Sequence, residues 1–242
     1  MRVVVVVPVL QEAAGVEAFL LALRAAVGDV EVVVVDGGST DGTPERAARH
    51  ARVLTAPRGR ARQMNAGAAA TAGGADDVLW FVHADCAVPP DALPALRAAL
   101  ADPAVVGGGF RLAFDRRSAG LELLRVTSNW RARYLHQVFG DQALFVRRRV
   151  FDELGGFPDL PLMEDLAFTR ALARRGRVVV ADVPVTASAR RLAAHGPWRM
   201  LVLMQWLKVR FLLGGDPGAI GRRYRRGTAR GRRAAGDGVR RR

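Results

Sequence analysis

Two valine runs limit the fold of this chain more than any other feature of its sequence. Residues 3–7 are all valine and lead directly to Pro8, and residues 32–35 are four further valines in a row. β-Branched residues favour strands, and an unbroken apolar run of this length is typical of a strand covered on both faces, as in a parallel sheet. The sequence therefore predicts an α/β fold with central strands buried between helices.

Helical spacing follows each predicted strand in the first hundred residues. Apolar residues recur at helical spacing in residues 16–26, and further helices are predicted at residues 60–72 and 91–101. Short strands are expected at residues 52–57 and 78–82. Because strands and helices alternate, we expect right-handed crossovers and a mostly parallel sheet flanked by helices.

Beyond residue 101 the pattern is less regular. Three strands and four helices are expected there. Strands are predicted at residues 104–114 and 177–185 and helices at residues 121–137, 164–175 and 198–213, with a further short strand and helix within residues 142–157. We expect one domain over residues 1–221, followed by an arginine-rich tail at 222–242 that is disordered.

Charge and cysteine content narrow the environment of the protein. The formal net charge is +14, and residues 222–242 hold ten arginines against one acid, Asp237. Such a tail suits contact with anionic lipid or nucleic acid. Cys86 is the only cysteine, which excludes an intramolecular disulfide and a zinc site built from cysteines. No run approaches the roughly 20 apolar residues that span a bilayer, so we expect a cytoplasmic protein.

Polar side chains gather where the predicted parallel strands end. Glu12 follows the first strand, Asp36 ends the second, and His83 and Asp85 end the strand in "LWFVHADC". Side chains at i and i+2 of a strand point to one face, so His83 and Asp85 can address one site while Ala84 points away. The carboxyl ends of parallel strands meet at one edge, where ligands bind. This convergence predicts a ligand site, although "DGGSTDGT" alone also fits a plain turn.

The residue types at this edge indicate a phosphate-containing ligand. The chain has neither a GxGxxG nor a GxxxxGKS motif, so a dinucleotide fingerprint and a P-loop are not supported. Carboxylates facing a diphosphate indicate a bridging Mg²⁺ or Mn²⁺. Arginines 58, 60 and 62 lie near the same edge and can bind phosphate in a fork geometry.

Taken together, these motifs resemble family 2 glycosyltransferases of the GT-A fold. The matching stretches are "VVVVVPVLQE", "VVVVDGGSTDGT", "RGRARQMNAGAAA", "FVHADCAVPP" and "GGFPDLPLMEDLAFTRALARRG", within residues 1–185. "HAD" stands where the family has its D-x-D metal motif and is similar to a variant in a small bacterial subgroup. Two positions depart from the family pattern: Gly37 replaces a second aspartate, and His83 replaces the first aspartate of D-x-D.

The resemblance implies a division of the chain and a set of site residues. Residues 1–100 would bind the nucleotide sugar, and residues 101–221 would form the acceptor half and the C-terminal helix. The implied contacts to the nucleotide sugar are Pro8, Glu12, Asp36, Gly38, Ser39, Arg60, Asn65, His83, Ala84 and Asp85. Asp85 and His83 would hold a divalent cation, Mg²⁺ or Mn²⁺, although a neutral His83 that is simply hydrogen-bonded remains the alternative. On the acceptor side we expect Gly140, Asp141, Gln142, Arg190 and Arg191.

The implied reaction is an inverting transfer from a nucleotide-diphosphate sugar. It needs a carboxylate to remove the acceptor proton, and the motif position favours Asp165 as the base with Glu164 beside it. Two other functions remain open from the sequence. One is a sugar nucleotidyltransferase, which would want a Gly-rich basic loop after the first strand. The other is a basic nucleic-acid-binding protein, although the tail lacks interleaved aromatic residues and no nucleic acid is expected.

Residues 198–213 bear on the partners of the protein. This predicted helix is apolar almost all round and precedes the arginine tail, so it suits a core helix, an oligomer interface or a helix lying on a membrane. The adjacent tail favours the membrane. We therefore expect a peripheral enzyme on the inner face of the cell membrane, with an apolar, lipid-like acceptor.

Overall fold

The computed structural model describes residues 1–71 and 73–237, with the backbone alone for Arg191 and residues 228–237. Its N-terminal part alternates strands and helices: β1 Val3–Val9, α1 Val16–Val27, β2 Glu31–Asp36, α2 Thr43–Ala47, β3 Arg52–Thr55, α3 Arg60–Ala69, β4 Val78–Phe81, β5 Cys86–Ala87 and α4 Ala92–Ala99. The C-terminal part contains β6 Val105–Phe114, α5 Ala119–Leu135, the short 3₁₀ helix η1 Gly140–Gln142, β7 Phe145–Arg147, α6 Arg148–Glu153, α7 Glu164–Leu172, β8 Arg177–Ala187, α8 Arg190–His195, α9 Pro197–Leu212 and α10 Pro217–Asp237.

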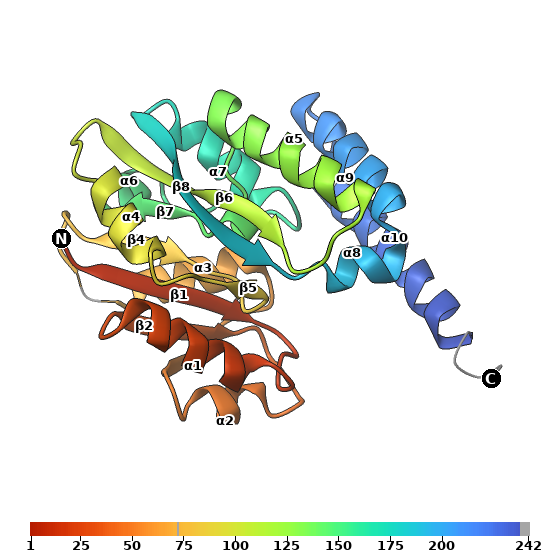
Figure 1. Ribbon diagram of the computed structural model, residues 1–242, viewed down its shortest axis with the longest axis horizontal. Helices are drawn as coiled ribbons and strands as arrows, with labels where there is room; N and C mark the ends of the chain where they lie inside the picture. Colours follow the sequence, from red (N-terminus) through yellow and green to blue (C-terminus); the bar gives the residue numbers. More distant parts are fainter. Residues whose placement is uncertain (72, 238–242) are drawn as a thin grey trace.

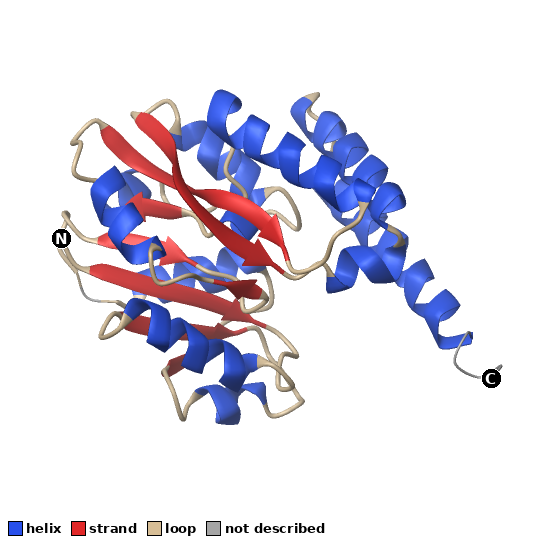
Figure 2. Cartoon of the chain, in the orientation of Figure 1, coloured by secondary structure: helices blue, strands red, loops and turns tan. Residues whose placement is uncertain are grey.

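Both parts of the chain contribute to one eight-stranded sheet in the order β3-β2-β1-β4-β7-β6-β8-β5 (Figure 1). The pairs β3-β2, β2-β1, β1-β4 and β6-β8 are parallel, and the short strands β7 and β5 pair antiparallel. The predicted mostly parallel α/β sheet is thus confirmed. Figure 2 shows helices on both faces of this sheet.

The valine run of β1 is buried on both faces, as its sequence predicts. Val5 and Val7 belong to the core layer that includes Leu20 of α1, whereas Val4 and Val6 belong to the layer with Met64 of α3. All of the valines in residues 3–7 are at most 3% exposed. Polar groups are therefore displaced to the ends of the strands, where the site lies.

The C-terminal helices form a third packed group. Leu207 of α9 and Ile220 of α10 pack against Met163 and Leu166, at the start of α7. No helix in the described ranges combines the length and apolarity needed to cross a membrane.

The segment after residue 221 differs from the expected disordered tail. The structure continues α10 through Asp237, and residues 238–242 lie outside the described residues. Arginine and alanine are strong helix formers, so an arginine-rich sequence can still extend a helix that is packed at its start.

The close approach of α3 to the sheet yields a stability prediction. An added Cβ at Gly67 would lie 2.4 Å from Val6 Cγ1 and 2.9 Å from Val35 Cγ2. The helix propensity gained by Gly67→Ala, ~1 kcal/mol, should be outweighed by an overpacking cost of about 1–3 kcal/mol. We expect net destabilisation in urea unfolding. The control Gly74→Ala, whose Cβ meets nothing within 4 Å, should unfold like the wild type; equal stability of both variants would contradict the packing argument.

Candidate active site

The loops that follow β1 and β2 hold each other in place. The backbone N–H of Gln11 donates to Ser39 Oγ at 2.9 Å, and the Gln11 amide exchanges hydrogen bonds with Thr40 at 3.0 and 3.2 Å. Glu12 N–H donates to Thr43 Oγ1 at 2.9 Å. Gln11 has a φ of 56°, a left-handed conformation that is uncommon outside glycine. Much of the polar "DGGSTDGT" turn therefore serves to fix the loop that carries Glu12.

Asp36 is only 2% exposed and shapes its own turn. Its Oδ2 atom accepts the backbone N–H groups of Gly38 and Ser39, each at 2.8 Å. This is the turn geometry that the sequence also allowed. Asp36 Oδ1, by contrast, is buried and has no hydrogen-bond partner in the described part of the chain. None of these three residues is among those lining the pocket described below.

Gln63 is a site residue that the sequence reasoning missed. Its amide donates to the carbonyl oxygens of Val9 and Val35, both at 2.8 Å, and so bridges the carboxyl ends of β1 and β2. A Cβ at Gly37 would lie 3.0 Å from this amide, so glycine at the place of the family's second aspartate leaves room for Gln63. The signal in the sequence was a glutamine on the buried face of α3, next to Met64.

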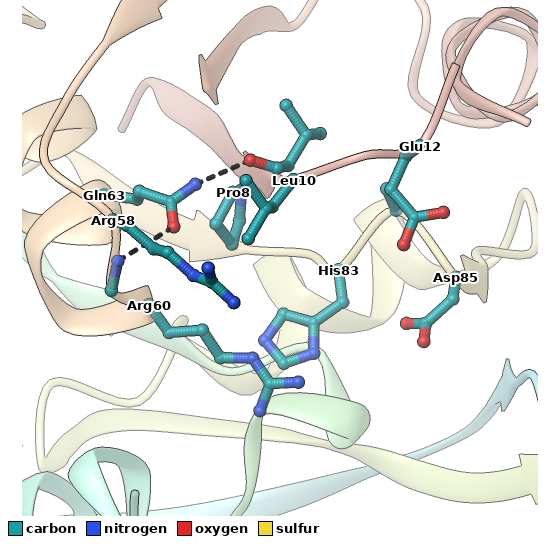
Figure 3. Close-up of a pocket in the computed structure, with 11 residues that line it drawn as sticks. Pro8, Leu10, Glu12, Arg58, Arg60, Gln63, His83 and Asp85 are labelled. Carbon is teal, nitrogen blue, oxygen red and sulfur yellow. Dashed lines mark hydrogen bonds between the residues drawn. The ribbon is translucent and has the colours of Figure 1, made fainter. Parts of the chain in front are cut away.

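A cavity of about 250 Å³ opens beyond β1 and β4 (Figure 3). Arg58 and Arg60 extend into it from one side, whereas Glu12 and Asp85 lie on the other, with His83 between the two pairs. The lining consists of Pro8, Val9, Leu10, Glu12, Arg58, Gly59, Arg60, Gln63, His83, Ala84 and Asp85. A pocket with two guanidinium groups opposite two carboxylates suits a ligand that carries phosphate and a cation.

Several predicted contacts lie elsewhere. Asn65 does not line the cavity; its amide exchanges two hydrogen bonds with the backbone of Phe157, at 2.8 and 2.9 Å. Arg62 forms an ion pair with Asp159 at 2.7 Å. Both side chains therefore tie α3 to the segment before α7 and leave Arg58 and Arg60 as the arginines at the cavity.

Arg190 and Arg191 lie at the start of α8. The guanidinium of Arg190 is 3.6 Å from Glu12, so this predicted acceptor-side residue reaches across to the loop after β1. For Arg191 the structure describes the backbone only.

His83 connects the cavity to the carboxylates of α7. A Cβ at Gly140 would lie 2.4 Å from His83 Cε1, so only glycine allows η1 to approach the imidazole this closely. The N–H of Gly140 donates to Asp165 Oδ2 at 3.0 Å. A small void of about 10 Å³ is bordered by His83, Gly140, Glu164 and Asp165, among other residues. The predicted donor and catalytic residues thus meet at one wall.

Glu164 and Asp165 occupy different environments although they are adjacent. Glu164 is 4% exposed, and its burial, together with the nearby charge of Asp165, raises the pKa of Glu164 to about 7 against the opposing effect of Arg60. Asp165 is partly exposed and accepts the Gly140 N–H. Met163, just before the pair, has a φ of 71°. A strained backbone of this kind costs about 1–3 kcal/mol and is common at functional sites.

Arg60 couples the cavity to these carboxylates. Desolvation lowers the pKa of Arg60, but the negative charges of Glu164, Asp165 and Asp85 outweigh it and raise the pKa overall. Tyr224 of α10 contributes in the same direction, so α10 also comes near the site.

The predicted acceptor residues of η1 have separate roles. Gln142 is 0% exposed, and its amide donates to Phe110 O at 3.1 Å, so it supports the loop from inside. Burial raises the pKa of Asp141 to about 6; Arg131 lowers this value and Asp165 raises it.

Arg131, which the sequence reasoning did not single out, holds η1 in place. It donates to Gln137 O at 3.0 Å and to Gln142 Oε1 at 3.2 Å. Its guanidinium also lies 3.5 Å from the centre of the Phe139 ring. The sequence offered no sign of this role beyond one arginine among several in the helix.

The mostly parallel sheet, with a polar cavity at the carboxyl ends of β1 and β4, has the arrangement expected of the GT-A fold. A model of glycosyl transferase family 2 matches residues 4–155, more than half of the chain, and the chain belongs to this family. It is thus a glycosyltransferase, and the family match favours this reading over the nucleotidyltransferase and the nucleic-acid-binding alternatives. Among curated proteins, none matches the chain.

Solved structures agree with the fold. The mannosyltransferase PcManGT from Pyrobaculum calidifontis, in complex with GDP-Man and Mn²⁺, has a TM-score of 0.66 and 22% identity over 98% of this chain and 75% of its own. Glucosyl-3-phosphoglycerate synthase from Mycobacterium tuberculosis, in complex with Mg²⁺ and UDP, has a TM-score of 0.55 and 22% identity over 77% of this chain and 70% of its own. S. aureus TarS 1-349, in complex with UDP-GlcNAc, has a TM-score of 0.56 and 18% identity over 78% of this chain and 58% of its own. At these identities the likeness establishes the fold.

The buried Glu164 yields a prediction about pH and stability. Because its folded-state pKa of about 7 exceeds the ordinary 4.5, its contribution to stability is complete below about pH 4.5 and is lost as the pH rises to about 7. Glu164→Gln removes this loss and should therefore gain stability relative to the wild type between about pH 5 and pH 8, by up to about 3 kcal/mol. Urea unfolding at both pH values measures the change.

Glu45→Gln, at an exposed position on α2, is the matched control and should show no such change. If Glu164→Gln and the wild type differ in unfolding free energy by the same amount at about pH 5 and pH 8, the raised pKa of Glu164 is contradicted.

Proposed function

We propose that the enzyme transfers a sugar from a nucleotide-diphosphate sugar to an acceptor hydroxyl with inversion at the anomeric carbon. The observation that carries the proposal is the shared wall at His83. On one side lies the cavity with Arg58, Arg60 and Asp85, and on the other lies the carboxylate pair of α7. A sugar held at this wall has its diphosphate on one side and a base on the other.

The donor would lie along the edge of the sheet. Arg58 and Arg60 face the diphosphate, since guanidinium groups bind phosphate through charge-assisted hydrogen bonds. Asp36 Oδ1 is a buried acceptor without a partner in the described residues, and it would accept a hydrogen bond from the nucleotide only after the turn that covers it had moved. GDP-Man, UDP and UDP-GlcNAc in the structures named above support a nucleotide-linked donor, without deciding which base this chain selects.

The residues fit a divalent cation that the diphosphate helps to hold. Glu12 and Asp85 place carboxylates on one side of the cavity, beside His83 (Figure 3). No group of three such side chains converges to hold a metal within the described part of the chain. Mg²⁺ is commonly bound through one or two carboxylates plus substrate phosphates, so Asp85, with His83 or Glu12, would complete the site. The cation would neutralise charge on the leaving diphosphate.

The acceptor hydroxyl would lose its proton to Asp165. The acceptor oxygen forms the bond to the anomeric carbon, the bond from that carbon to the diphosphate oxygen breaks, and the proton passes to the carboxylate. Asp165 is the more accessible of the pair and is oriented by the Gly140 N–H, whereas Glu164 is buried. Glu164 would then influence Asp165 electrostatically, without contacting the acceptor itself.

The acceptor is proposed to be lipid-like and to be reached at the inner, anionic face of the cell membrane. This proposal is supported by the chain from residue 188 to 237, which contains twelve arginine or lysine residues but only two acids, Asp216 and Asp237. Each basic group near an anionic leaflet contributes about 1 kcal/mol.

Donor binding tests the assignment of Asp85. Wild-type protein should be stabilised in thermal-shift measurements by at least one of a panel of nucleoside diphosphates, more strongly with Mn²⁺ than without, because a ligand that binds only the folded state raises its stability. Asp85→Asn should lose the part that depends on Mn²⁺. Asp91→Asn, an exposed position before α4, should retain it. If Asp85→Asn keeps the full response to Mn²⁺, Asp85 does not serve the cation.

The two carboxylates of α7 can be distinguished by kinetics. Asp165→Asn preserves size and helix position but removes the proton acceptor, so kcat for release of nucleoside diphosphate from the donor should fall by about 10²-fold or more. Donor binding should be unchanged. Glu164→Gln is the matched comparison and should have the smaller effect; the opposite order would make Glu164 the base.

A further inference from the structure

Large apolar side chains are exposed almost entirely on two helices. Of thirteen such residues in the described part of the chain, eleven belong to α5, to α9 or to the residue that ends α9. We call this group the α5–α9 face; its members are Leu123, Val126, Trp130, Tyr134, Leu135, Trp198, Val202, Trp206, Val209, Leu212 and Leu213. A soluble monomer rarely gathers its exposed apolar residues in this way, which marks an interaction surface.

The spacing of these residues makes one stripe on each helix. On α5 the stripe contains residues 123, 126, 130 and 134, and on α9 residues 198, 202, 206, 209 and 213. Residues three or four apart lie on the same side of a helix. Opposite the stripe, α9 buries Met200, Leu201 and Leu207. The exposed stripe is thus not the core-facing side of the helix.

The two helices lie side by side (Figure 1). A Cβ at Gly120 of α5 would lie 3.5 Å from the ring of Trp198, at the start of α9. Farther along the two helices, Lys208 of α9 has a lowered pKa. Burial is the main cause, and the positive charge of Arg131 of α5 adds to it, so these two side chains lie near each other. The helices therefore run in the same direction, and their apolar stripes belong to one region of the surface.

Aromatic rings on this face are bordered by arginines. The guanidinium groups of Arg210 and Arg223 lie 5.6 and 5.8 Å from the centre of the Trp206 ring. Trp130 and Tyr134 pack at 5.7 Å. Rings with an apolar body and a polar tip, next to basic side chains with apolar stems, are suited to the boundary between lipid headgroups and acyl chains.

The charges around the face decide which partner it fits. Helix α9 contains no acidic residue, and Glu122, the one acid of α5, is bound by Arg125 through two hydrogen bonds. Arg116 and Arg117, beside the start of α5, border a cavity of about 680 Å³ together with Arg125. A two-fold dimer would place this face against its own copy and bring basic rims together, which is unfavourable. An anionic surface with an apolar interior matches both properties.

We propose that the α5–α9 face docks the enzyme on an anionic lipid membrane. This inference rests on the proposed transfer to a lipid-like acceptor and adds the docking surface and the orientation of the site. Leu207 and Ile220 pack on Met163 and Leu166, which flank Glu164 and Asp165. Because the packed side of α9 lies opposite its exposed stripe, membrane contact through α9 would place the base about one helix diameter, roughly 10 Å, from the bilayer that carries a lipid-linked hydroxyl.

Vesicle flotation with the full chain tests the docking face. Wild type should bind vesicles of phosphatidylglycerol and phosphatidylcholine, bind phosphatidylcholine alone more weakly, and lose binding in high salt. The combined variant Trp130→Ser, Tyr134→Ser, Val202→Ser and Trp206→Ser should lower the partition coefficient by about tenfold or more, because these apolar groups enter the headgroup region. Leu21→Ser, at an exposed residue of α1, is the control and should bind like the wild type.

Tryptophan fluorescence of the wild type gives a measurement that needs no variant. Of the four tryptophans, Trp130, Trp198 and Trp206 lie on the face, whereas Trp80 is 0% exposed. Brominated lipids in the same vesicles should therefore quench most of the emission. Binding without quenching would show that another surface docks, and would overturn the proposal.

The remaining outcomes also decide the question. If the combined variant binds vesicles as strongly as the wild type, or if the wild type does not bind, the proposal that the α5–α9 face docks on the membrane is refuted. A dimer in sedimentation that the combined variant loses assigns the face to a second copy instead, and also overturns it. Donor hydrolysis in the absence of vesicles is measured in parallel, since it depends on the site alone. A wild type that hydrolyses donor but ignores vesicles refutes the docking face and leaves the transferase, whereas absence of hydrolysis refutes the proposed transfer.

Discussion

The parallel pairing of β1 with its two neighbours determines where everything else in the site can lie. β1 is hydrogen-bonded to β2 on one side and to β4 on the other, in register from Val4↔Glu31 and Val3↔Val78. Because parallel strands end at the same edge, the segments after these strands converge there. Both faces of β1 are covered by apolar core residues. The polar side chains of the segments that follow the strands therefore lie at the edge of the sheet.

At that edge, close contacts at glycines and long-range charge organise the chemistry. Glycine at position 140 lets η1 touch His83 and give its N–H to Asp165, while glycine at position 37 leaves space for Gln63 to join β1 and β2. The negative charges of Glu164, Asp165 and Asp85 all raise the pKa of Arg60. The cavity that Arg60 lines and the carboxylates of α7 therefore interact electrostatically, so a change in the charge of one affects the other.

The C-terminal helices connect this unit to the outer surface. One side of α9 packs with α10 on the start of α7, and its other side carries an exposed apolar stripe. A helix that is apolar around its circumference normally lies in a core. Here the opposite sides of α9 have different surroundings, and the positive charge beside the stripe separates it from an ordinary helix packing surface.

The sequence by itself determined the α/β class, the parallel strands and the residues at the strand ends, because local periodicity and turn chemistry record burial and chain direction. It also predicted that Glu12, Asp36, His83 and Asp85 gather at one edge of the sheet; Glu12, His83 and Asp85 line the cavity there, whereas Asp36 does not. Only the tertiary structure decided that Asn65 and Arg62 bind the segment before α7, that Gln142 and Arg131 support η1 from within, and that Gln63 joins two strands. These side chains find partners far away in the chain, and the partner of a polar side chain depends on packing between elements, which no local pattern in the sequence records.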